Sequence, residues 1–154
     1  MLNLRKSSKF RFLLVMVGIF LFSASTFAQR VIEMDGTDRM KFTVEQIDAK
    51  PGEEITVKLH VISQLPAVAM GHNFALLKQG VDGRAFSQSS SMHKDNEYID
   101  PDKENDVIAH TKMGHGGETV EVTFKAPEKS GDYEYVCTFP GHYVSGMKGT
   151  LTVK

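Results

Sequence analysis

The feature of this sequence that most restricts its fold is an alternation of apolar and polar residues with a period of two. Four segments show it: residues 55–61, 120–125, 132–137 and 150–154. This period places successive side chains on opposite faces of a β-strand. Pro and Gly occur between these segments, in "AKPGEE", "KAPEKSGD" and "PGHYVSGMKG", as turns require. We therefore predict an all-β protein, an antiparallel sandwich or barrel.

Residues 82–106 break this pattern. The stretch is polar and ends in "DPDKEND". We expect a long excursion between strands, irregular or with one short helix, of the kind that leaves the sheets of a β-sandwich.

The first 28 residues have the composition of a secretory signal peptide. A basic start is followed by an apolar run over residues 12–22 and by small residues up to Ala28. The run is shorter than the roughly 20 apolar residues of a membrane span. We predict cleavage after Ala28, with Ser25 as a second possible site. An uncleaved anchor, the one membrane contact expected, is the alternative. The rest, residues 29–154, is sized for one domain. We expect this domain to be exported to the periplasm and to be soluble there.

The charge balance excludes one class of partner. The net charge of −1 becomes −5 when the four basic residues of the signal segment are left out. Because nucleic-acid binding needs clustered Lys and Arg, we expect no nucleic-acid partner.

Cys137 is the single cysteine of the chain. Oxidising compartments favour paired cysteines, so a lone thiol there needs an explanation. It is either a small buried hydrophobe or a metal ligand. His142 and Met147 follow in the pattern Cys-x4-His-x4-Met. A thiolate, imidazoles and a weak thioether together suit copper in both of its oxidation states.

A trigonal copper centre needs a second imidazole, and His72 in "AMGHNFALL" is the candidate. Gly71 has no side chain to keep its carbonyl away from a metal. The Asn73 amide can tie the His72 loop to the Cys137 loop by hydrogen bonds. The predicted metal residues are thus His72, Cys137, His142, Met147 and Gly71, with Asn73 supporting them.

The segments "GHNFALL" and "CTFPGHYVSGMKGTLTVK" resemble the copper-binding segments of azurins and auracyanins, type 1 blue copper proteins of the cupredoxin family; "DVIAHTKMGHGGETVEVTF" resembles the family segment between them. The resemblance implies a Greek-key β-sandwich, one copper and one-electron transfer. It makes His72, Cys137 and His142 the equatorial ligands and Met147 an axial ligand. The Gly71 carbonyl would lie on the opposite axial side.

The expected function is electron transfer between a redox donor and an acceptor, without enzymatic chemistry. The electron is expected to pass through His142, and the partners to dock transiently on an apolar patch. That patch comprises Met70, Pro140, Gly141, Tyr143 and Val144. Copper carriage or buffering without a redox role is the alternative. Two Met–His pairs, at residues 92–93 and 113–115, are either ordinary surface residues or a peripheral copper site.

Overall fold

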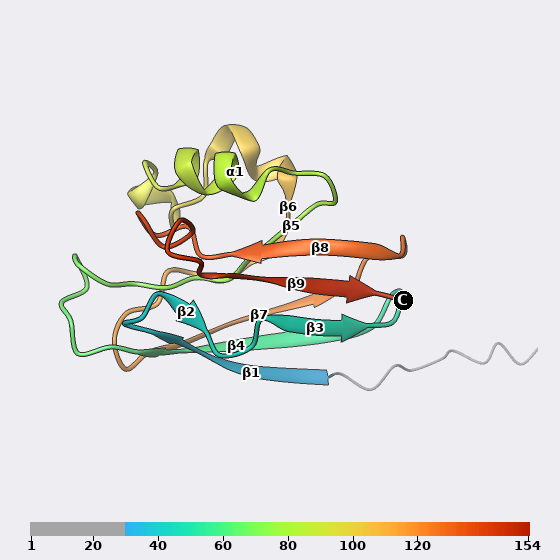
Figure 1. Cartoon of the computed structure of the whole chain (residues 1–154), viewed down its shortest axis with the longest axis horizontal. Coiled ribbons are helices and arrows are strands. Elements are labelled where there is room, and N and C mark those ends of the chain that lie inside the picture. The colour runs from blue at the N-terminus through green and yellow to red at the C-terminus, as the bar shows by residue number, and fades with distance from the viewer. Residues whose placement is uncertain (1–29) are drawn as a thin grey trace, which may run out of the picture.

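The computed structural model describes residues 30–154, which form two β-sheets packed face to face (Figure 1). One sheet has the strand order β2-β1-β4-β7, and the other β3-β9-β8-β5-β6. The strands are β1 (Arg30–Thr37), β2 (Lys41–Phe42), β3 (Gln46–Ala49), β4 (Glu54–Ile62), β5 (Ala75–Leu77), β6 (Val107–His110), β7 (Thr119–Lys125), β8 (Gly131–Val136) and β9 (Lys148–Val153). The predicted all-β Greek-key sandwich is confirmed. The predicted signal peptide lies outside the described residues.

Strand β4 shows how the alternating pattern builds the core. Ile55, Val57 and Leu59 are fully buried between the sheets. The intervening Thr56 is also buried, and its hydroxyl lies 2.7 Å from that of Thr123 on β7. The alternation therefore predicted which side chains face the core, while a cross-strand hydrogen bond lets one polar residue be buried on the other face.

The expectation of purely antiparallel sheets is wrong for two strand pairs. β1 pairs with β4 in parallel over its whole length, and β3 pairs with β9 in parallel. The remaining pairs are antiparallel. A period of two reports the face of each side chain and is blind to the direction of the neighbouring strand.

The predicted excursion is present and contains three short helices: α1 (Gly83–Ser90) and the 3₁₀ helices η1 (Lys94–Asn96) and η2 (Pro101–Asp106). Asp82 begins α1, because its carboxylate accepts hydrogen bonds from the amides of Arg84 and Ala85. Phe86 of α1 packs with Val136 of β8 in a small second core. The excursion thus covers the outer face of the second sheet (Figure 1).

Two loops meet at one end of the sandwich. The connection from β4 to β5 carries residues 63–74, and the connection from β8 to β9 carries residues 137–147; both lie at the left in Figure 1. These loops hold the predicted metal residues. Within residues 30–154, no helix has the length and apolar character needed to cross a bilayer.

Candidate metal centre

Three predicted ligands converge in the interior. The sulfur of Cys137 lies 3.4 Å from Nδ1 of His142 and 3.9 Å from Nδ1 of His72. The two Nδ1 atoms are 3.2 Å apart. The three ligand atoms all lie within 4.8 Å of one another, and all three residues are buried. Cys137 and His142 follow His72 by 65 and 70 positions in the chain. The fold therefore brings one thiol and two imidazoles from distant segments to a common point.

Burial decides the charge state of this cluster. It lowers the pKa of His72 from 6.5 to about 4, against the smaller opposing effects of Asp38 and the backbone of Thr37. Burial, with His72 as a second cause, also lowers the pKa of His142 to about 4. Both imidazoles are therefore neutral near pH 7 and have a lone pair free for a metal.

The thiol is held protonated until a metal replaces its proton. Burial raises the pKa of Cys137 to about 12, although backbone N–H groups of Asn73 and Phe139 favour the thiolate. A bound metal would supply the missing positive charge, and binding would release the proton. Two neutral imidazoles and one sheltered thiolate form a soft, low-charge donor set that fits copper.

The loop from Cys137 to Met147 is closed by its own backbone. The amide of Cys137 donates to the carbonyl of Met147 at 3.1 Å, and the amide of Met147 donates to the carbonyl of His142 at 3.0 Å. Met147 is fully buried. These backbone hydrogen bonds hold three predicted ligands, Cys137, His142 and Met147, in one compact loop.

The other side of the centre is held by an isolated β-bridge. His72 and Gly114 exchange two backbone hydrogen bonds, each 2.9 Å long. The carbonyl oxygen of Gly71 lies 4.0 Å from the sulfur of Cys137. The carbonyl predicted to be axial is thus in contact with the ligand cluster.

Asn73 joins the two loops, as the sequence predicted. Its Oδ1 accepts a hydrogen bond from the amide of Thr138 at 2.9 Å, and its Nδ2 lies 2.8 Å from the Thr138 hydroxyl. Nδ2 also donates to the carbonyl of Glu97 at 3.2 Å. Asn73 and Thr138 are both fully buried. The residues that follow His72 and Cys137 are therefore bonded to each other.

Sequence reasoning missed Gly36, at the end of β1. A Cβ atom at this position would lie 2.8 Å from Cδ2 of His72 and 3.0 Å from the terminal methyl of Met147. Real Cβ atoms do not approach other atoms that closely, so β1 passes beside His72 and Met147 only because residue 36 is glycine. No sequence signal marks this glycine, because the contact joins distant segments.

Sequence reasoning also missed a polar contact made by Tyr143, the residue that follows His142. The hydroxyl of Tyr143 donates to a carboxylate oxygen of Glu134 at 3.2 Å, and Nζ of Lys148 lies 3.3 Å from the same hydroxyl. Lys148 and Glu134 form an ion pair at 3.5 Å. This group anchors the residue after His142 to strand β8.

The remaining predictions fare differently. Met70 is only 6 % exposed, so the prediction that it contributes to a surface patch is wrong; it packs inside because its amide bonds back to Pro66 and turns the loop. Val68 on the same loop is 82 % exposed.

His93 lies 3.6 Å from Asp100 in an ion-pair geometry. Neither His93 nor His115 belongs to a group of three metal-ligating side chains within the part of the chain that the structure describes.

Comparison with known proteins agrees with this geometry. Residues 28–154 match the pattern of the copper binding proteins of the plastocyanin/azurin family. Azurin of Alcaligenes faecalis is 37 % identical over 123 residues, which are 78 % of this chain and 94 % of that protein. Azurin of Pseudomonas aeruginosa strain PAO1 is 37 % identical over 130 residues, 82 % of this chain and 86 % of that protein.

A solved structure shows the same similarity in three dimensions. Auracyanin A, a blue copper protein of Chloroflexus aurantiacus, is 31 % identical and superposes with a TM-score of 0.73, covering 82 % of this chain and all of that one. Copper is the cofactor that this fold and these side chains accommodate. The chain belongs to the plastocyanin/azurin family of copper-binding proteins.

Proposed function

We propose that this protein carries single electrons between redox partners, with one copper ion held by His72, Cys137, His142 and Met147. Bound copper supplies one-electron exchange between Cu(II) and Cu(I). The observation that carries the proposal is the buried convergence of two imidazole Nδ1 atoms on one thiol sulfur. The related azurins and auracyanins are electron-transfer proteins rather than enzymes, and this chain has the same role.

The protein's own contribution is to hold the ligands still. The Cys137–Met147 loop is closed by backbone hydrogen bonds, and the His72 loop is fastened by the bridge to Gly114 and by Asn73. Ligands that cannot move give nearly the same geometry to both oxidation states, so little reorganisation accompanies electron transfer. In this proposal the carbonyl of Gly71, whose oxygen lies 4.0 Å from the Cys137 sulfur, would be a further weak donor to the copper.

The first test is a visible absorption spectrum during titration with Cu(II). We expect an intense thiolate-to-copper band that saturates at one equivalent. Cys137→Ser should abolish the band, whereas His93→Gln should leave it unchanged because His93 lies outside the ligand cluster. A band that survives loss of the thiol, or binding of several equivalents, would contradict the ligand assignment.

Copper carriage without a redox role makes a different prediction. A carrier exchanges Cu(I) readily, through exposed sulfur and imidazole ligands. Here the ligand residues are at most 2 % exposed, so exchange requires the loop to open. We expect a soluble Cu(I) chelator to remove the metal slowly, over hours. Removal within seconds, together with unstable Cu(II) binding, would favour the carrier.

Partner docking is proposed at the surface of the Cys137–Met147 loop. Pro140 and Gly141 are exposed there, and Val144 is 68 % exposed. The ring of Phe139 lies tilted against that of His142, with centroids 4.7 Å apart. Because the ligand His142 sits directly under this uncharged surface, a partner seated on it approaches the metal without crossing the sandwich.

Electron self-exchange tests this surface without an identified partner. The rate between Cu(I) and Cu(II) forms of the protein is measured by NMR line broadening. In Val144→Asp, two like charges meet in every encounter, so we expect a slower rate, by about tenfold at low ionic strength. Val31→Asp is the matched control, because Val31 is an exposed valine at the end of β1 that is distant from the Cys137–Met147 loop. Equal rates in the two variants would exclude docking at Val144.

We also propose that residues 1–28 direct export, with the mature protein soluble in the periplasm. The basic start, the short apolar run and the small residues before Gln29 support this. The intact mass of the protein recovered from a periplasmic extract tests the cleavage site. A chain that begins at Gln29 is expected; a full-length, membrane-bound chain would indicate a retained anchor.

A further inference from the structure

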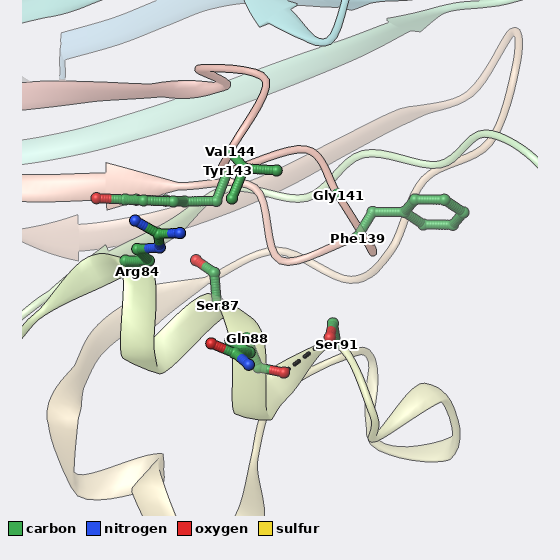
Figure 2. Close-up of a pocket in the computed structure, with 8 residues that line it drawn as sticks. All are labelled: Arg84, Ser87, Gln88, Ser91, Phe139, Gly141, Tyr143 and Val144. Carbon is green, nitrogen blue, oxygen red and sulfur yellow. Dashed lines mark hydrogen bonds between the residues drawn. The ribbon is translucent and has the colours of Figure 1, made fainter.

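A groove of about 280 Å³ lies between helix α1 and the loop that carries Cys137, His142 and Met147. Figure 2 shows Arg84, Ser87 and Gln88 on the helix side, and Phe139, Tyr143 and Val144 on the loop side. The helix side is hydrogen-bonding and carries one positive charge, whereas the loop side is largely apolar. One side of the groove therefore presents polar side chains next to the loop that holds the predicted metal ligands.

Ser87 has a hydrogen-bonding group without a partner. The residue is 5 % exposed, and its hydroxyl makes no hydrogen bond with any described residue. The neighbouring Ser89 and Ser91 instead donate to backbone carbonyls one turn back, at 3.1 and 2.8 Å. In Figure 2 the Ser87 oxygen points from the helix toward the loop. A buried hydroxyl without a partner is unfavourable, and a group entering the groove would satisfy it.

Arg84, one turn earlier, is an unpaired cation. It is exposed, and its guanidinium makes no ion pair or hydrogen bond with residues 30–154. The nearby acids are already engaged: Asp82 binds the backbone amides that begin α1, and Glu134 binds Lys148 and the hydroxyl of Tyr143. The guanidinium therefore remains free to bind an anion that comes from outside.

We propose that this groove binds the carboxylate of an aspartate or glutamate on the surface of the redox partner. A carboxylate accepts hydrogen bonds from both a guanidinium and a hydroxyl, and its aliphatic stem would lie against the apolar side formed by Phe139 and Val144. The proposal rests on docking at the loop surface, as proposed above. It adds a local charge contact that the overall negative charge of the domain does not predict.

Two matched redox probes test it: ruthenium(III) polypyridyl complexes that carry either carboxylate or neutral carboxamide groups. Each accepts one electron from the Cu(I) protein, which becomes the Cu(II) form, and the second-order rate is measured at low ionic strength. The variants are Arg84→Gln and Ser87→Ala. Lys125→Gln removes the same charge at the far end of β7, and Ser89→Ala removes a hydroxyl outside the groove. The visible spectrum of each variant reports that the metal centre is intact.

We expect Arg84→Gln to slow oxidation by the carboxylate probe about fivefold, and Ser87→Ala about twofold. The carboxamide probe and both control variants should change little. Equal slowing in Arg84→Gln and Lys125→Gln would mean long-range attraction without a site, and unchanged rates in both groove variants would overturn the proposal. Self-exchange of Val144→Asp is independent of this result, so failure of the groove is distinguishable from failure of the docking surface.

Discussion

The bonds between Asn73 and Thr138 can be tested as a unit by a double-mutant cycle. Asn73→Ala removes the acceptor of the buried Thr138 amide, the donor to the Glu97 carbonyl and both contacts with the Thr138 hydroxyl, at 2.8 and 3.1 Å. A buried donor left without a partner costs about 1–3 kcal/mol, and each lost hydrogen bond about 1 kcal/mol. We expect the free energy of unfolding of the metal-free protein to fall by about 4 kcal/mol.

Thr138→Ala removes only the hydroxyl, so it should cost about 1–2 kcal/mol. In the double variant that hydroxyl has already lost its partner, and we expect a coupling energy of about 1–2 kcal/mol. Urea denaturation followed by circular dichroism measures all four proteins, and the visible spectrum of the copper form reports any movement of the ligands. If the two single effects add to within about 0.5 kcal/mol, the residues act independently and the reasoning fails.

Three further predictions concern the same end of the molecule. Gly36→Ala forces its methyl group against the ring of His72, so we expect a loss of about 1–3 kcal/mol in unfolding free energy and a shifted copper spectrum; an unchanged spectrum would show that the strand moves instead. Tyr143→Phe removes a partly exposed contact with Glu134, so unfolding free energy should fall by about 1 kcal/mol or less, with the absorption band kept. The third is a pH effect. His72 and His142 have a pKa of about 4 when folded and 6.5 when unfolded, so the unfolded chain binds more protons between these values. Metal-free stability should therefore be full above pH 6.5 and fall progressively toward pH 4 in urea titrations, and replacing both histidines by glutamine should flatten that dependence.

The candidate ligand set could be proposed from the sequence because metal chemistry leaves a local trace. Cys137, His142 and Met147 lie within one short loop, and a lone cysteine is conspicuous by its chemistry alone. His72 was found through its neighbours, a glycine and an asparagine. The sequence alone does not show that these residues come together in space. That inference depended on the fold class, which the alternating strand pattern predicted.

Features that depend on distant contacts could not be predicted in this way. Gly36 matters because of His72 and Met147, which lie 36 and 111 positions later in the chain. Met70 is apolar and adjacent to the site, yet only the path of its loop decides that it is buried. Strand β5 is too short to show alternation, and all three of its residues are buried because α1 covers its outer face.

The parallel pairing of β1 with β4 and of β3 with β9 has a practical consequence for handling the molecule. Arg30 donates to the carbonyl of Asp48, and the terminal Lys154 forms an ion pair with the carboxylate of the same residue at 3.0 Å. Both therefore lie at the end of the sandwich away from the loops that carry His72 and His142 (Figure 1). Protein attached to an electrode through its carboxyl terminus would face the solution with its copper end, and a fusion partner at that terminus would leave the same end free.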